Sequence, residues 1–373
     1  MKEAFEVSNQ RKEPFVHIVH RSDITRRKAV LIRVIAVVLG LAVSALFING
    51  ITHLDPISVY ESMFSGAFGT ANRIWVTLKD MSLLLCIAVG LAPAFRMRFW
   101  NIGAEGQILI GGLVCAALMI YVGDSVPNII LLIMMAFASM AAGALWGFIP
   151  AYFKAKFRTN ETLFTLMMNY IALQLVEFYI DVWDKKQSHS VGVINSATRA
   201  GWLPKAMGSA YFWNVVIVLA ITIGMYFYLR NTKQGYEIAV VGESENTARY
   251  AGISVSKVIK RTMLISGAIC GLAGFLEVSG VSHTISSSTA GGRGFTAIIV
   301  AWLAKFNTLG MILITLLITF LNRGANQIAS DFNFNKYASD ILIGIILFFI
   351  LGSEFFIHFR VVFRSREKKE VQA

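Results

Sequence analysis

Long apolar runs alternate with short polar stretches along almost the whole chain. A helix needs about 20 mainly apolar residues to cross the hydrocarbon core of a bilayer, and most of the runs approach that length. They lie at residues 30–50, 75–94, 101–121, 128–153, 161–183, 211–230, 262–282, 293–304, 308–322 and 337–358. This pattern predicts an all-α polytopic membrane protein with about ten transmembrane helices.

The eighth run, 293–304, is too short to cross a bilayer comfortably. A flexible polar run of serine and glycine residues, 286–294, precedes it, and a second irregular stretch lies at 94–107, after Pro93. Irregular backbone at membrane depth is tolerated only where protein or a water-filled cavity surrounds it. Two such Gly-interrupted segments favour a transport pathway. The pattern leaves open whether 293–304 spans the bilayer or re-enters it.

Basic residues follow the even-numbered runs. They are Arg96 and Arg98, then Lys154, Lys156 and Arg158, then Arg230, Lys233, Lys257, Lys260 and Arg261, and then Lys305. The positive-inside rule therefore predicts a cytoplasmic N-terminal segment (1–29), a transmembrane domain (30–358) with a cytoplasmic loop at 231–261, and a basic cytoplasmic tail (359–373). The basic region 184–210 is an exception, and we assign it to the outside because long exported loops escape the rule more often.

Composition agrees with this class and excludes others. Of 373 residues, 56% are hydrophobic and 15% are charged, whereas soluble domains carry about a quarter charged residues. The net charge of +12 is spread over short loops, so we predict no nucleic-acid surface. An odd number of cysteines, Cys86, Cys115 and Cys270, each inside an apolar run, favours neither disulfides nor a metal site. The chain contains no Gly-Lys pair and hence no P-loop, so we expect it to bind no cofactor itself.

Glu105 is an ionisable residue inside a predicted span, close to Asn101 and Gln107. A carboxylate at membrane depth is costly and normally faces a cavity or a partner, and Asn101 is a residue type that caps helices. One interpretation is that this cluster lines the path of a polar solute. The other is that Glu105 sits at the cytoplasmic interface near Arg96 or Arg98 and anchors the helix.

Glu161, Thr165 and Asn169 are spaced four residues apart and so share one helix face. That face is expected to point away from lipid. It either faces the solute or holds neighbouring helices together through hydrogen bonds, and the second role is favoured for Thr165 and Asn169 taken singly.

Residues 246–254 interrupt the polar loop with a helix signature. Asn246 is predicted to cap a short helix, Thr247–Ala251, which ends at Gly252, a residue favoured just beyond helix ends. Loops as long as 231–261 usually have a function in compact proteins. We therefore expect this segment to contact a cytoplasmic partner.

In this order, several motifs resemble the permease subunits of ATP-binding-cassette importers of the ribose and branched-chain amino acid type, and most closely the nucleoside and simple-sugar branch. The motifs lie at Asn101–Gln107, Asn160–Ile171, Gly235–Ile253, Ser266–Gly274 and Gly294–Phe295. The resemblance implies a multi-pass protein of the bacterial cell membrane. It also implies that 246–254 is a coupling element, with Glu243, Asn246, Ala248, Arg249, Tyr250 and Gly252 as its candidate residues.

Partners also follow from the resemblance. They are a second, related permease in a heterodimer, an ATPase subunit with tandem nucleotide-binding domains that holds ATP and Mg, and an extracellular binding lipoprotein or periplasmic protein. We expect a pathway for nucleosides lined by the polar residues above and by Phe295. Trp100, Tyr170 and Phe295 are aromatic candidates for stacking on a base. The alternatives are a simple sugar such as ribose, a proton-coupled transporter that titrates Glu105 or Glu161, and, least favoured, a membrane enzyme.

Overall fold

The computed structural model describes residues 16–21, 24–52, 55–184, 191–333 and 336–363. Residues 1–15 of the expected N-terminal segment, Lys185 and Lys186 of region 184–210, and residues 364–373 of the expected tail lie outside the described residues. The chain divides into two compact units, one made of the residues up to Met63 and from Gly324 onward, the other of Phe64–Arg323. In the described part, nine helices are long and apolar enough to cross a membrane and one apolar helix is shorter, which confirms the predicted fold class.

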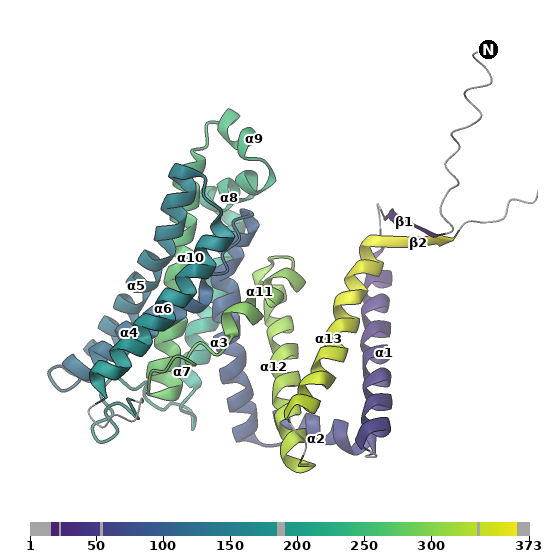
Figure 1. Cartoon of the computed structure of the whole chain (residues 1–373), viewed down its shortest axis with the longest axis horizontal. Coiled ribbons are helices and arrows are strands. Elements are labelled where there is room, and N and C mark those ends of the chain that lie inside the picture. Colours follow the sequence, from purple (N-terminus) through teal and green to yellow (C-terminus); the bar gives the residue numbers. More distant parts are fainter. Residues whose placement is uncertain (1–15, 22–23, 53–54, 185–190, 334–335, 364–373) are drawn as a thin grey trace, which may run out of the picture. The chain divides into compact units, whose positions relative to one another are not determined.

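The first unit is built on two antiparallel helices. Its elements are β1 (Val16–His20), α1 (Arg26–Thr52), the beginning of α2 (Pro56–Phe68), the end of α12 (Thr308–Asp331), α13 (Lys336–His358) and β2 (Phe359–Phe363). Helices α1 and α13 lie side by side (Figure 1), and Arg33 donates to the Glu354 carboxylate at 2.6 Å. Strands β1 and β2 pair antiparallel, with Ile18 opposite Val361. The sequence analysis predicted neither α2 nor the strands.

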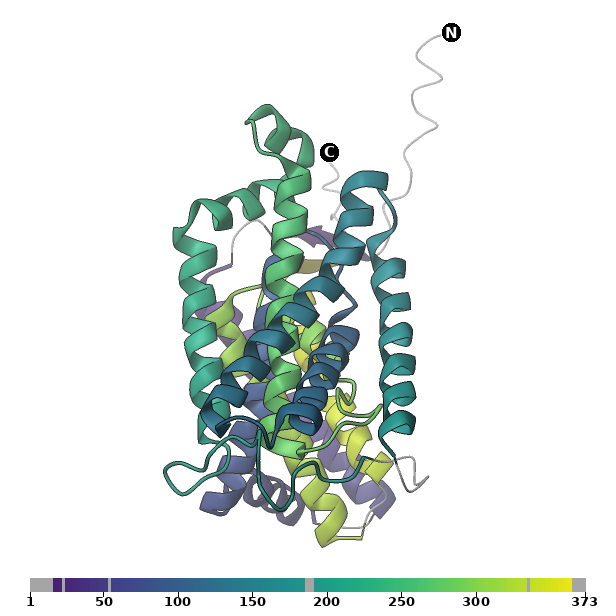
Figure 2. The ribbon, with the colours of Figure 1, turned by 90° about the vertical axis from the view of Figure 1, so that its left-hand side faces the viewer.

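The second unit contains the remaining helices. These are α3 (Ala71–Arg96), α4 (Ala104–Val122), α5 (Asn128–Phe157), α6 (Glu161–Trp183), α7 (Phe212–Asn231), α8 (Lys233–Glu243), α9 (Glu245–Tyr250), α10 (Val255–Glu277), the π-helical turn η2 (Val278–Ser282) and α11 (Arg293–Leu303), with the rest of α2 and α12. Most of α3, α4 and α10 is buried. Figure 2 shows α8 and α9 at one end of this unit and the loop that precedes α7 at the other end.

Glycines set how closely the central helices approach one another. A Cβ atom on Gly111 of α4 would lie 2.6 Å from the Gly271 Cα atom of α10, and one on Gly143 of α5 would lie 2.7 Å from the same atom. Ser139 of α5 donates its hydroxyl to the Gly111 carbonyl at 2.9 Å. Helices α4, α5 and α10 therefore pack backbone against backbone, as membrane helices with small interface residues do.

Helix α11 spans 11 residues, or about 16 Å at 1.5 Å per residue, about half of a hydrocarbon core. Residues 283–292 precede it without regular helix. The expected flexible run is internally bonded: Ser286 donates its backbone N–H to the Thr289 hydroxyl at 2.8 Å. Helix α3 continues through Pro93 to Arg96 and α4 begins at Ala104, so the irregular stretch expected at 94–107 is only 97–103. Pro93 lies in the last turn of α3, and because proline has no N–H, the helical bond to the Val89 carbonyl is missing there.

The loop before α7 is fixed to the helix ends beneath it. Gly201 donates its backbone N–H to the Asn128 side chain at 2.7 Å, and Ser279 donates its hydroxyl to the Gly201 carbonyl at 2.6 Å. The Trp202 and His283 rings stack, with centroids 3.7 Å apart. The two rings help to line a cavity of about 320 Å³. Gly201 and Trp202 are therefore bound to α5 and to the end of the α10–η2 span.

Replacing Gly271 with Ala tests the glycine packing. The new methyl group would clash with the Ser139 carbonyl oxygen, and we expect a loss of stability of about 1–3 kcal/mol, typical of overpacking. Thermal unfolding of the purified protein in detergent measures this. Gly224→Ala on α7 is the matched control, because no atom lies within 4 Å of the added carbon. Equal melting temperatures for the two variants would contradict the packing argument.

The stacked His283 predicts a dependence of stability on pH. Burial lowers the pKa of the imidazole below its usual value of 6.5, so the unfolded chain takes up the proton more readily than the folded protein. The stability from this group is therefore fully present above about pH 6.5 and is lost as the pH falls below it. We expect the melting temperature to fall less steeply with acidification in His283→Phe, which keeps a ring on Trp202. If the melting temperature fell equally with acidification in the wild type and in His283→Phe, the pH dependence of stability would come from other groups.

Candidate functional site

The segment between α3 and α4 turns back into the unit and ends in a buried amide cluster of Asn101, Gln107 and Ser266. Asn101 is fully buried. Its side-chain oxygen accepts from the Gln107 amide at 3.3 Å, and its nitrogen donates to the Ser266 hydroxyl at 3.3 Å. Ser266 lies near the middle of the span Val255–Ser282, so the cluster lies at membrane depth. Asn101 and Gln107 are thus together, as predicted, and Ser266 is an addition.

Asn101 does not cap α4, contrary to the sequence interpretation. Helix α4 begins at Ala104 with Gly103 at its cap position, and the Asn101 oxygen accepts the Gly103 N–H at 3.0 Å, before the helix begins. Asn169 of α6 supplies the cap instead, since its side-chain oxygen accepts the Gly106 N–H at 2.8 Å. The start of α4 is therefore capped by another helix.

Helix α6 holds this segment through one polar face, as its spacing predicted. Asn169 also donates to the Ile102 carbonyl at 2.9 Å, and the Thr165 hydroxyl accepts the Ile102 N–H at 3.2 Å. Glu161, one turn earlier, pairs with Lys154 at 2.7 Å. Thr165 and Asn169 thus join elements, the role favoured for them, while Glu161 binds the end of α5.

Glu105 lies in the first turn of α4 and caps the start of α11. Its two carboxylate oxygens accept the N–H groups of Gly292 at 2.6 Å and Gly294 at 2.8 Å. Helix α11 has no cap from its own side chains, and a carboxylate is favourable at the positive end of a helix. A side chain at position 294 would place its Cβ 2.6 Å from a Glu105 oxygen. The sequence interpretations did not include this contact.

Charged side chains from α3, α10, α11 and α12 form ion pairs near the start of α11. The sequence analysis assigned them no role. Glu277 of α10 pairs with Arg293 at 3.0 Å. Asp80 of α3 pairs with Lys79 at 3.1 Å and accepts from Arg323 of α12 at 2.6 Å. Charges inside membrane helices are rare and usually paired or functional. These charged residues lie within or beside apolar runs of the sequence, and that position could have identified them as candidates.

The three aromatic candidates are separated. Trp100 stacks on Trp302, with ring centroids 5.2 Å apart. The rings of Phe95 and Phe306 stack on each other nearby, with centroids 6.1 Å apart. Phe295 and Tyr170 are exposed in this unit, on α11 and α6. Phe295 therefore does not join the amide cluster, and among the residues that the structure describes, Trp100 is the one of the three candidates that stacks on another ring.

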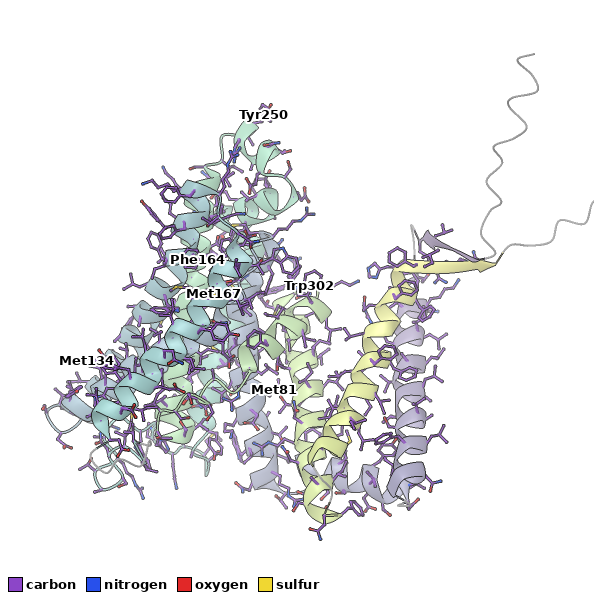
Figure 3. The ribbon with its side chains drawn as sticks, in the orientation of Figure 1. Met81, Met134, Phe164, Met167, Tyr250 and Trp302 are labelled. Carbon is purple, nitrogen blue, oxygen red and sulfur yellow. The ribbon has the colours of Figure 1, made fainter. Side chains whose placement is uncertain are left out.

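The candidate coupling residues gather at the far end of the unit on α8 and α9. Glu243 ends α8, Ala248 is a buried residue of α9, and Tyr250, the last residue of α9, is 93% exposed (Figure 3). Arg249 pairs with Glu245 at 3.2 Å. A cleft of about 510 Å³, which Asn246 helps to line, lies beneath α9. The predicted short helix therefore exists and exposes an aromatic side chain.

The predicted cap of this helix is wrong by two residues. The Ser244 hydroxyl accepts the Thr247 N–H at 3.2 Å, and α9 begins at Glu245, before Asn246. Serine and asparagine are both good caps, and Ser244 prevails because α8 ends there. The end was predicted correctly: Gly252 has a φ of +76°, and Ile253 donates its N–H to the Ala248 carbonyl at 2.9 Å, as in a Schellman motif.

The sequence matches the family described as branched-chain amino acid transport system / permease component over residues 73–351. The chain belongs to this permease family. The resemblance inferred from the motifs is thereby confirmed, and the permease is a multi-pass protein of the bacterial plasma membrane. Membership of a transport family agrees with the expectation of a non-enzyme, and it implies ATPase and substrate-binding partners.

Three curated relatives cover most of the permease. It is 32% identical to the guanosine ABC transporter permease protein NupP of Bacillus subtilis, over 88% of this chain and 95% of that protein. It is 29% identical to a glucose ABC transporter permease protein of Haloferax volcanii, over 88% of each. It is also 29% identical to the nucleoside ABC transporter permease protein NupB of Lactococcus lactis, over 82% of this chain and 86% of that protein. No solved structure matches the permease.

Glu105→Gln tests the cap on α11. A glutamine offers one acceptor oxygen and turns an N–H group toward the second backbone N–H, so one charge-assisted bond is lost, worth about 1.5–3 kcal/mol. We expect a lower melting temperature in detergent and impaired solute uptake at normal expression. Glu177→Gln removes an exposed carboxylate from α6 and serves as the control. Unchanged melting and uptake in Glu105→Gln would show that the contact is dispensable.

Proposed function

We propose that this chain is the permease subunit of an ATP-driven importer and forms the translocation pathway for nucleosides. The observation that carries the substrate class is the similarity to a guanosine permease over 95% of that protein's length. The nucleoside permease of Lactococcus lactis supports the same class. The family and the fold supply the transport architecture, and the solute class is our inference.

The proposed pathway elements are the amide cluster and the starts of α4 and α11. Asn101, Gln107, Thr165 and Asn169 are buried and place amide and hydroxyl groups at membrane depth, which suits hydrogen bonding to a base or a sugar. Helix starts that meet at this depth are typical of solute sites in transporters. Glu161 and Phe295, outside this cluster, remain proposed pathway residues from the sequence alone.

The partner set completes the proposal. A second, related permease would form a heterodimer with this one, an ATPase subunit with tandem nucleotide-binding domains would bind ATP and Mg, and an extracellular binding protein would deliver the solute. The α8–α9 loop is the proposed contact with the ATPase. The exposed Tyr250 and the cleft beneath α9 support this assignment, because buried aromatic anchors are common at protein interfaces.

A simple sugar is the second candidate solute, favoured by the similarity to the glucose permease of Haloferax volcanii. Proton-coupled transport receives less support. Both oxygens of Glu105 accept backbone N–H groups, and Glu161 is paired with Lys154, so each carboxylate that such a mechanism would titrate already has partners.

Uptake of labelled guanosine by cells with and without the gene tests the proposal. We expect gene-dependent uptake that unlabelled adenosine and uridine inhibit and that ribose and leucine do not. Uptake should stop on depletion of ATP at a constant proton gradient. With the protein confirmed in the membrane, the absence of gene-dependent guanosine uptake would favour the sugar candidate. Uptake that survives ATP depletion but not a protonophore would refute the ATP-driven mechanism.

A further inference from the structure

Helices α8 and α9 are joined without a linker. A single residue, Ser244, ends α8 and caps α9: its N–H binds the Val240 carbonyl at 3.1 Å, and its carbonyl accepts the Ala248 N–H at 3.0 Å. Helix α8 has 11 residues and α9 has 6. The short helix α9 is therefore continuous in the chain with the longer α8, with Ser244 bonded to both.

Helix α8 in turn rests against the end of α3. Gly242, in its last turn, is buried and packs so closely that an added Cβ would clash with the Arg96 carbonyl oxygen and lie 3.2 Å from the Met97 Cα atom. The Arg96 guanidinium also binds the Leu229 carbonyl, at the end of α7, at 3.2 Å. Glu237 of α8 pairs with Arg261 of α10 at 3.0 Å. We name the Gly242–Arg96 backbone contact the Gly242 joint.

The segment that begins at the joint leads directly to the proposed pathway. After Arg96 it turns at Arg98, whose φ is +60°, and Phe99 donates its N–H to the Ala94 carbonyl at 3.0 Å. Two residues later Asn101 enters the amide cluster, and four residues beyond that Glu105 holds the start of α11. The chain between joint and site is short and bonded at each step.

Space lies beside the joint. A cavity of about 180 Å³ is bordered by Met97, Arg98 and Phe99 on one side and by Gly242 and Ser244 on the other. The segment 97–99 therefore has room to follow α8 when that helix moves, and the core, in which α4, α5 and α10 are held backbone to backbone, need not be unpacked first.

We propose that the Gly242 joint transmits the movement of α9 to the segment 97–103, and through Asn101 and Glu105 to the amide cluster and α11. This rests on the proposed function, in which an ATPase moves α9. Gly242 and Arg98 are positioning residues: neither touches the solute, and both fix how the motion reaches it. The contact must be backbone to backbone because a flexible side chain between the helices would absorb a small displacement.

Gly242→Ala in the assembled transporter, reconstituted in proteoliposomes, tests the proposal. The ATPase subunit should co-purify at the wild-type level, while guanosine moved per ATP hydrolysed should fall by roughly two- to thirtyfold, the range for residues that carry coupling. Gly224→Ala, which meets no atom, should match the wild type. Arg249→Glu on α9 should instead lose the ATPase subunit. Wild-type coupling in Gly242→Ala would overturn the proposal.

A second pair of variants covers the case in which Gly242→Ala fails to fold. The Arg98 side chain is exposed and its backbone has a left-handed conformation. Arg98→Gly therefore fits without strain and increases the conformational freedom of the backbone in this segment. Arg98→Ala removes the same charge without that freedom. We expect uncoupling in the glycine variant beyond that in the alanine variant, and equal coupling in both would contradict the relay.

Hydrogen exchange separates this proposal from the proposed function. In the wild-type assembly, a non-hydrolysable ATP analogue should change the exchange of residues 97–103 without any solute present, and Gly242→Ala should abolish that change. If guanosine is not transported but this response is found, the solute class fails and the relay stands. If guanosine is transported and residues 97–103 do not respond, the relay fails and the proposed function stands.

Discussion

The close approach of α4, α5 and α10 is the constraint on which the second unit depends. Lipid offers no hydrophobic drive for helices to associate, so contact between them relies on van der Waals packing and hydrogen bonds. Gly111, Gly143 and Gly271 bring three backbones together, and Ser139 adds a bond across the contact. This rigid centre fixes Ser266 on α10 and Gln107 on α4 at one level, so that Asn101 can bridge them.

Capping between elements follows from this arrangement. A helix that begins inside the membrane has free N–H groups and no water to satisfy them. Helix α4 meets this need with Asn169 of α6, and α11 meets it with Glu105 of α4. Each start depends on a side chain from another helix. Because the segment 97–103 leads into α4, whose Glu105 caps α11, a displacement of that segment acts on both starts.

Local patterns predicted much of this structure, and distant contacts set the rest. The apolar runs gave the helices, the four-residue spacing gave the shared face of Thr165 and Asn169, and Gly252 marked the end of α9. The contact of Glu105 with Gly292 joins residues 187 positions apart, and no local signal in one sequence encodes it. Ser244 and Asn246 are equally good caps by type, and only the end of α8 decides between them.

The half-length helix α11 explains why polar residues gather within an apolar chain. Because it covers only part of the membrane depth, residues 283–292 must supply the rest as irregular backbone, whose N–H and C=O groups need partners. Serine and threonine side chains provide some of them, as Ser282 does for the Thr284 carbonyl and Thr289 for the Ser286 N–H. Glu277 holds Arg293 at the junction. The start of α11 is thus fixed by side chains and by an adjacent helix, while backbone bonds through the turn at 304–307 join its end to α12.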